Sequence, residues 1–348
     1  MKNLHIKSIA PLFLALLLVL TACGQESGTS AEPMESTAES TQDTSESEEA
    51  TEGTVTINDL HGSQEVPVNP ERVASLDNRT FETLEAWGVE LVAAPKAVMT
   101  SESAYVADEN VVDIGNHREP NFELLVAADP EVVIIGQRFA SFYEDIKELL
   151  PEAIILDFNF DVSETAEETG VSLVNGLTNS TLELGELFDK NDEAQALVDE
   201  LNASIDQVKE AYNGEDTVMA TVVSGGQIGY SAPSHGRVWG PLFEIFDWTP
   251  SLDVNASSSN HQGDDISLEA IAESNPDWLL VLDRDGATTS NEESLPAQDV
   301  IENSATLQNA TALTEGQVVY APTDTYVNES IQTFIDLFKT LANAFSGQ

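Results

Sequence analysis

The sequence predicts two α/β lobes joined by one long helix, with a ligand cleft between the lobes. A unit made of a short apolar-periodic helix, a proline and a continuous apolar run occurs twice, at 122–138 and 268–284. Apolar residues at roughly helical spacing fill the stretch from 164 to 188, between the two copies. The 348 residues leave room for two domains, and 41% hydrophobic residues are enough to build their cores.

The repeated unit has the same landmarks in both copies. Glu123 and Glu269 each precede a proline by seven residues, and Arg138 and Arg284 each follow that proline by eight. The apolar run after each proline is typical of a strand buried on both faces. Because ligands bind outside the carboxyl ends of strands in open α/β sheets, both arginines are predicted to face a shared cleft. The alternative is that any two α/β units look alike at this level.

The N-terminal lobe is expected to cover residues 55–163. It opens with a hairpin around His61-Gly62, because short strand-like runs flank this pair. The other elements expected in this lobe are, in order, strand 72–76, helix 80–87, strand 89–94, the first repeated unit, helix 142–150 and strand 153–157.

A long helix at 164–189 is predicted to join the lobes, and its length implies small hinge motion and a largely preformed cleft. The C-terminal lobe is expected to cover residues 190–348. Its expected elements are, in order, helix 193–212, strand 218–223, helix 242–246, the second repeated unit, strand 317–320 and an amphipathic helix at 330–345.

The amino terminus carries the signals of a secreted, lipid-anchored protein. Two lysines and an apolar stretch at 10–20 predict a signal peptide at 1–22, too short to remain as a spanning helix. The run Leu20-Thr21-Ala22-Cys23-Gly24 resembles a bacterial lipobox, which implies cleavage before Cys23 and lipidation of its thiol. The alternative is an ordinary signal peptide with a chance cysteine. Residues 23–54 are acidic and rich in Ser, Thr and Glu, so we expect a disordered tether.

The composition excludes several kinds of partner. A formal net charge of −49 argues against nucleic acid and against an anionic lipid surface. Cys23 is the single cysteine, so no intrachain disulfide forms. Because only six arginines stand in so acidic a chain, the position of each is informative.

Enzyme signatures are mostly missing, and polar loops carry the positive signal. There is no G-x-S-x-G elbow, H-E-x-x-H, Walker A or G-x-G-x-x-G motif. Arg138, Arg237, Arg284 and His261 lie in glycine-rich or polar loops. A guanidinium presents donors in a planar fork, and three of them facing one cleft would match a ligand of charge about −3. The alternatives are surface ion pairs for the arginines and a solvated loop position for His261.

The chain resembles the solute-binding lipoproteins of iron–siderophore ABC importers, which are class III solute-binding proteins. The likeness is greatest to ferric-catecholate binders of the petrobactin and enterobactin type. The motifs that carry it are Gly115 to Glu123, Gly136-Gln137-Arg138 with Phe142-Tyr143, Gly236-Arg237, His261 to Ser267, Asn275-Pro276-Asp277 and Asp283-Arg284.

The resemblance implies a set of roles. Arg138, Arg237 and Arg284 would contact iron-bound catecholate oxygens. We also expect Trp239 to line the cleft, with a place in the core as the alternative. His261 and Tyr326 would complete the Fe(III) shell of a tetradentate siderophore, with Tyr320 as the alternative tyrosine. Two departures, a less aromatic loop around Tyr326 and one extra residue at 262–265, leave open whether the protein ligates iron itself.

The resemblance also implies partners and a location. Glu123 and Glu269 would each dock onto arginines of an ABC permease that works with an ATPase. The ferric siderophore is the transported ligand and not an intrinsic cofactor. We expect a monomer held at the extracytoplasmic face of the cell membrane.

Three rival hypotheses remain. The same fold could carry haem or a cobalamin. A lipid-anchored serine hydrolase would use Ser234 or Ser224 with His261, although no oxyanion-hole pattern accompanies them. A third is a lipoprotein that only adheres or signals.

Overall fold

The computed structural model describes residues 53–163, 165–254, 258, 260–288 and 295–347. The predicted signal peptide, Cys23 and the predicted tether up to residue 52 lie outside the described residues. Thr54, the last residue of that predicted tether, already belongs to the first strand.

The described residues form three sheets. The strands are β1 (Thr54–Asp59), β2 (Gly62–Pro67), β3 (Val73–Ser75), β4 (Leu91–Ala94), β5 (Val112–Asp113), β6 (Val132–Ile135), β7 (Ile154–Asp157), β8 (Thr217–Ser224), β9 (Gln227–Tyr230), β10 (Thr249–Pro250), β11 (Trp278–Asp283) and β12 (Val318–Tyr320). Strands β1 and β2 pair antiparallel and form the predicted hairpin around Gly62.

The helices mostly match the expected ones and add several short turns. They are α1 (Phe81–Ala86), η1 (Lys96–Val98), α2 (Ala104–Ala107), α3 (Phe122–Ala127), η2 (Ala140–Phe142), α4 (Tyr143–Leu149), α5 (Thr169–Leu187), α6 (Asn191–Ala211), α7 (Gly240–Phe246), α8 (Leu268–Ser274), α9 (Arg284–Thr288), α10 (Ala297–Glu302), α11 (Thr311–Thr314), α12 (Thr325–Asn328) and α13 (Ile331–Phe345). The helices η1, α2, η2 and α9 to α12, and the strands β5, β9 and β10, were not predicted.

The first large sheet has the strand order β5-β4-β3-β6-β7, and all its pairs are parallel. We call the residues around this sheet the N-lobe. The chain leaves β3 toward β4 and β5 and then returns to the other side of β3 as β6. This reversal makes the carboxyl ends of β3 and β6 a topological switch point, where ligands bind in open α/β sheets.

The second large sheet has the order β10-β8-β11-β12, with β9 antiparallel to β8. We call the residues around this sheet the C-lobe. Here the order reverses between β8 and β11, which gives a second switch point. Strands β6 and β11 are buried along almost their whole length, as the two apolar runs of the repeated unit predict.

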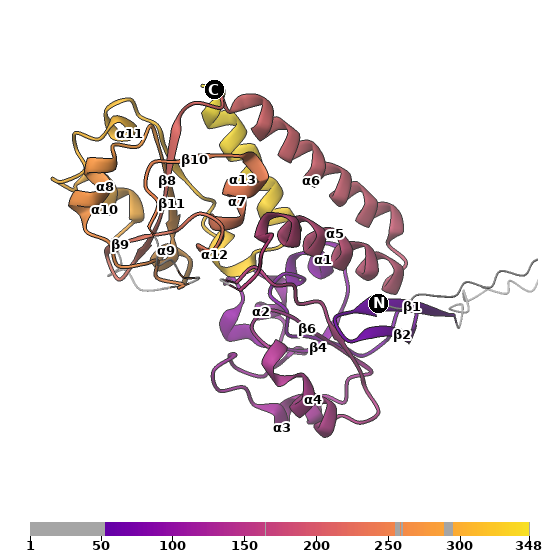
Figure 1. Cartoon of the computed structure of the whole chain (residues 1–348). Coiled ribbons are helices and arrows are strands. Elements are labelled where there is room, and N and C mark those ends of the chain that lie inside the picture. The colour runs from indigo at the N-terminus through magenta and orange to yellow at the C-terminus, as the bar shows by residue number, and fades with distance from the viewer. Residues whose placement is uncertain (1–52, 164, 255–257, 259, 289–294, 348) are drawn as a thin grey trace, which may run out of the picture. The chain divides into compact units, whose positions relative to one another are not determined.

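The long helix α5 packs into both lobes. Leu173 and Leu177, in its first half, belong to the core of the C-lobe, whereas Leu184 and Leu187 belong to the core of the N-lobe. It begins at Thr169, later than the expected residue 164. Helices α6 and α13 lie side by side beyond it (Figure 1). The fold class predicted from the sequence, two α/β lobes joined by a long helix, is confirmed.

Hydrogen bonds join the lobes a second time, beside α13. Asn78 of the N-lobe donates to the carbonyl oxygens of Val327 and Asn328. Ser330, which caps α13, donates to the carboxylate of Glu82 in α1. The segment 326–330 therefore lies against the carboxyl end of β3, at the N-lobe switch point.

Candidate functional site: an arginine-lined cavity

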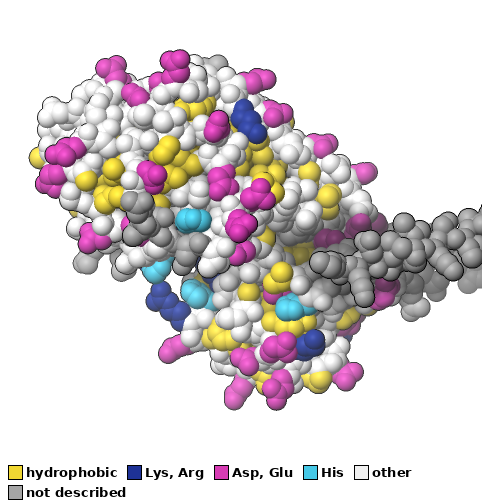
Figure 2. All heavy atoms as spheres, viewed as in Figure 1, with side chains coloured by type: hydrophobic (Ala, Val, Ile, Leu, Met, Phe, Trp, Pro, Cys, Tyr) yellow, Lys and Arg dark blue, Asp and Glu magenta, His cyan; other side chains and the backbone are white. Residues whose placement is uncertain are grey.

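A cavity of about 720 Å3 is lined by residues from both lobes. Five of the chain's six arginines and three of its five histidines line it. These residues are Arg79, Arg118, Arg138, Arg237, Arg284, His117, His235 and His261. Among the residues in Figure 2 whose placement is described, basic and histidine side chains gather where this face is hollowed, and most other charged side chains on the face are acidic. A cavity this cationic in a chain of charge −49 is suited to an anionic ligand.

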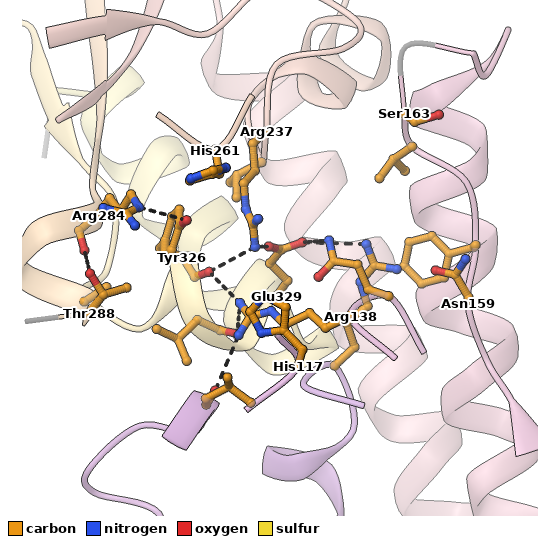
Figure 3. A pocket seen from close by; sticks show the side chains of 18 of the residues that line it. His117, Arg138, Asn159, Ser163, Arg237, His261, Arg284, Thr288, Tyr326 and Glu329 are labelled. Atoms are coloured by element: carbon orange, nitrogen blue, oxygen red, sulfur yellow. Dashed lines mark hydrogen bonds and ion pairs between the residues drawn. The ribbon is translucent and has the colours of Figure 1, made fainter. Parts of the chain in front are cut away.

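The two switch points place most of these arginines. Arg79 follows β3 and Arg138 follows β6, so both lie at the N-lobe switch point. Arg284 directly follows β11, at the switch point of the C-lobe. Arg237 lies in the loop between β9 and α7. The structure thus brings the three arginines predicted from the sequence into one cavity (Figure 3).

A buried carboxylate lies in the middle of the arginines. Glu329 is only 4% exposed, and it accepts hydrogen bonds from Arg237 and from Gln137 Nε2, the latter at 3.0 Å. Arg79 Nη2 lies 3.6 Å from the same carboxylate. Although burial opposes its charge, the neighbouring arginines, Arg237 first, hold the pKa of Glu329 below its ordinary value. Glu329 is therefore a charged anion between the lobes.

Arg138 reaches across the lobe boundary to backbone oxygens. Its guanidinium donates to the carbonyl of Val327 at 3.2 Å and, at 3.5 Å, to those of Tyr326 and Val98. Burial and the nearby Arg237 lower its pKa to about 10. Arg138 thus remains protonated at neutral pH, but in surroundings that disfavour its charge.

Arg284 and Tyr326 form a pair on the C-lobe side. Arg284 Nε donates to the phenolic oxygen of Tyr326 at 3.1 Å, and its Nη1 donates to Ser224 Oγ at 3.1 Å. The guanidinium of Arg237 lies over the Tyr326 ring, 4.6 Å from its centroid. Tyr326 therefore lies between two arginines, and its oxygen already has a cationic donor.

Two histidines of the cavity, His117 and His261, favour the neutral form. Burial, followed by nearby arginines, lowers the pKa of His117 and of His261. A neutral imidazole has a lone pair that can accept a hydrogen bond or bind a metal ion. The Nδ1 atoms of His117 and His235 are buried without a partner among the described residues.

The prediction that Trp239 lines the cleft is wrong. Its side chain is fully buried in the C-lobe core, and Val238 lines the cavity in its place. Two tight turns, Gly236 N–H to Ala232 and Gly240 N–H to Gly236, reverse the chain here. Trp239 is therefore the residue directly before α7, and its side chain packs in the C-lobe core.

Sequence reasoning missed Arg79, His117 and Glu329. Arg79 follows a predicted strand, so the rule that found Arg138 and Arg284 would also have found it. His117 belongs to the loop 115–120, whose motif indicates the family but does not mark this residue. No sequence signal marks Glu329, because its burial depends on how α12 and α13 meet the N-lobe.

The two glutamates of the repeated unit occupy matching positions. Glu123 and Glu269 are exposed in the first turns of α3 and α8, each the second residue of its helix. Their helices are capped by Asn121 and Ser267, which accept from the backbone N–H three residues on. Neither glutamate lines the cavity.

Neither serine of the hydrolase hypothesis lines the cavity. Ser224 is 7% exposed and accepts from Arg284, while Ser234 is held in a left-handed conformation with φ of 65°. Within the part of the chain that the structure describes, no group of three His, Cys, Asp or Glu is arranged to hold a metal ion. No helix among the described residues is long and apolar enough to cross a membrane.

Comparison with known sequences identifies the family. The pattern of the periplasmic binding proteins matches residues 73–325. The chain belongs to the periplasmic binding protein family. It is 27% identical over 330 residues to the petrobactin-binding protein YclQ of Bacillus subtilis, which covers 92% of both chains. It is also 27% identical over 268 residues to the ferric-anguibactin-binding protein FatB of Vibrio anguillarum, covering 76% of this chain and 79% of FatB.

Solved structures of this periplasmic binding protein family share the fold. The crystal structure of YclQ has a TM-score of 0.71 at 22% identity and covers 85% of this chain and 99% of YclQ. The catecholate-siderophore binding protein VctP of Vibrio cholerae has a TM-score of 0.69 at 22% identity, covering 85% of this chain and all of VctP. The family and its named relatives are binding proteins.

Proposed function

We propose that this chain captures a ferric siderophore of the catecholate class outside the cytoplasm and delivers it to an ABC permease. The observation that carries this proposal is the gathering of five of six arginines around one cavity in a chain of charge −49. Relatives named for binding petrobactin and ferric anguibactin support the same ligand class.

The ligand would be recognised through its charge and its oxygens. Ferric catecholates carry negative charge spread over oxygen atoms, and guanidinium groups donate to such oxygens from a planar fork. Arg237 and Arg284 have 18% and 22% of their side-chain surface exposed, so both can reach a ligand in the cavity. Arg138 supplies a third cation from the N-lobe.

The iron arrives with the siderophore. His261, whose pKa is lowered by burial and by the arginines around it, would serve as one further ligand when the siderophore leaves the iron shell incomplete. Tyr326 would serve as the second, after Arg284 has released or shared its phenolic oxygen. The binding step requires no covalent chemistry from the protein.

Delivery and anchoring would use other parts of the chain. Glu123 and Glu269, exposed at matching places in the two lobes, would pair with cationic residues of the permease, whose ATPase drives uptake. The chain would act as a monomer with the lobe boundaries at 163 and 190. Lipidation of Cys23 would hold it at the membrane, so Cys23→Ser should move the protein from the detergent phase to the aqueous phase in phase partitioning.

A titration of tryptophan fluorescence tests the ligand class. The purified protein is titrated with a ferric hexadentate catecholate, a ferric tetradentate catecholate, a ferric hydroxamate, haem and a cobalamin. We expect sub-micromolar quenching by the catecholates alone, since only they combine iron with high negative charge. Tighter binding of haem, a cobalamin or the hydroxamate would overturn the ligand class, and binding of none would overturn the proposed function.

A further inference from the structure

Glu329 combines burial, charge and an unusual backbone. It lies at the C-terminal end of α12 with φ of 51°, in the left-handed region that side chains other than glycine rarely adopt. Its side chain contacts Arg79 and Gln137 of the N-lobe and Arg237 of the C-lobe. In Figure 3 its carboxylate lies between the arginines of the two lobes.

We propose that Glu329 is a specificity-determining residue that sets the charge of the ligand bound best. Its fixed negative charge lowers the net charge of the cluster formed by Arg79, Arg138 and Arg237 by one unit. The arginines alone would favour a strongly anionic ligand over a less anionic one. With Glu329 present, this preference is smaller. This inference rests on the proposed function, because it assumes an anionic ligand.

The burial of the pair keeps the carboxylate in place when a ligand enters. The side chains of Arg79 and Glu329 are only 3% and 5% exposed. The guanidinium of Arg79 also lies over the Phe160 ring, 3.8 Å from its centroid. Moving Glu329 away would leave Arg79 as an uncompensated buried charge, which is strongly unfavourable. The ligand is thus expected to meet the arginines and Glu329 together.

The same carboxylate makes the arginine cluster possible. Burial and then Arg237 lower the pKa of Arg138, and Glu329 opposes this shift. Glu329 also accepts a hydrogen bond from Arg237 and so fixes its guanidinium beside the Tyr326 ring. Glu329 therefore acts on the ligand through charge and through the position of Arg237.

A pair of isostructural ligands isolates the charge effect. One hexadentate tris-catechol siderophore is loaded with Fe(III), which gives a trianion, or with Ti(IV), which gives a dianion of nearly the same shape. The quantity measured is the ratio of the two affinities. At contact range in a partly buried cavity, one unit of cluster charge should change this ratio by about tenfold.

Three variants move the cluster charge in known directions. Glu329→Gln keeps the shape and removes the negative charge, so the ratio should shift about tenfold toward the Fe(III) complex. Arg79→Met removes a positive charge, so the ratio should shift toward the Ti(IV) complex. The double variant Arg79→Met/Glu329→Gln restores the wild-type cluster charge and should restore the wild-type ratio.

The outcomes separate this inference from the proposed function. A ratio that stays within about twofold of wild type in both single variants, or that moves the same way in both, would overturn the role of Glu329. If Glu329→Gln leaves Arg79 unpaired and the protein does not fold, the comparison of Arg79→Met with the double variant still decides, because loss of the Glu329 charge must move the ratio about tenfold back toward the Fe(III) complex. If wild type binds neither complex, the proposed function fails instead.

Discussion

Each of the two repeated units, 122–138 and 268–284, places an arginine beyond a buried strand. The surroundings of the two arginines differ. Both helices have a side-chain cap, and Asp129 and Asn275 both adopt a left-handed conformation, with φ of 50° and 49°. The units diverge only at the end of the strand. Arg138 is directed at carbonyl oxygens of the segment 326–327, whereas Arg284 contacts a phenol and a hydroxyl.

The difference comes from α12 and its C-cap residue Glu329. This segment lies against the N-lobe, so Arg138 donates to its backbone carbonyl oxygens and Arg79 pairs with the Glu329 carboxylate. Arg284 faces the cavity from the C-lobe, and its guanidinium contacts the side chains of Tyr326, Ser224 and the neighbouring Asp285. A repeated unit thus determines where an arginine stands, while the rest of the chain determines what the arginine contacts.

The largest effect is expected at Gly136, whose matching position in the second unit is Leu282. A Cβ at Gly136 would lie 2.3 Å from the side chain of Asp77, whereas Leu282 is buried in β11. Gly136→Ala should therefore lower the free energy of unfolding by at least about 3 kcal/mol and weaken ligand binding, because it displaces the loop carrying Arg138. Urea unfolding measures this effect. Gly53→Ala, where no atom lies closer than 3.9 Å, is the control.

Asp77, whose side chain lies against Gly136 of the first unit, makes the stability of the N-lobe depend on pH. Burial raises the pKa of Asp77 to about 6, and the nearby Arg79 only partly offsets this effect. The folded state therefore binds the proton more tightly than the unfolded state, and wild-type stability falls as the pH rises from about 4 to about 6. Asp77→Asn should remove this fall, which amounts to at most about 3 kcal/mol. Parallel stability curves for the two proteins would contradict the raised pKa.

Arg138 and Arg284 should respond differently to loss of charge. The lowered pKa of Arg138 means that the folded state disfavours its charge. Arg138→Met should therefore raise the free energy of unfolding by about 2 kcal/mol while it weakens binding. Arg284→Met should weaken binding and leave stability within about 0.5 kcal/mol of wild type. Thermal unfolding of both variants decides the matter, and equal changes in stability would contradict the distinction.

The smallest effects are expected at the helix caps, where the two units agree. Asn121→Ala and Ser267→Ala should each lower the free energy of unfolding by about 1 kcal/mol, since each removes one acceptor for a backbone N–H. If the two losses in unfolding free energy differ by more than about 1 kcal/mol, the two units already differ at their helix caps. Chemical unfolding of the two variants in parallel provides the comparison.

The sequence was sufficient to predict the features that depend on local pattern. The repeated unit predicted β6, β11, Arg138 and Arg284, because strand burial and the strand-end rule act within a few residues. The existence of the main helices followed from apolar spacing, although α5 begins at Thr169 and not at the expected residue 164. The glycine-rich and polar loops predicted Arg237 and His261, the family resemblance added Tyr326, and all three line the cavity.

Features that depend on contacts between distant segments could not be predicted. Glu329 contacts Arg79 and Gln137, which lie 250 and 192 residues away. Trp239 was misplaced because a tight turn around Gly236 decides which of two adjacent residues faces the cavity. Its aromatic character alone fitted a cleft wall and a core equally well.

The central claim, that the arginines of the cavity bind an anionic iron complex, is tested most directly by two variants of equal charge. Arg284→Ala and Arg72→Ala each remove one positive charge, but Arg72 lies outside the cavity in ion pairs with Asp129 and Glu131. Calorimetric titration with a ferric tris-catecholate gives both affinities. We expect Arg284→Ala to lose at least about tenfold in affinity and Arg72→Ala to stay within about twofold of wild type. Equal losses, or no loss in Arg284→Ala, would contradict the account.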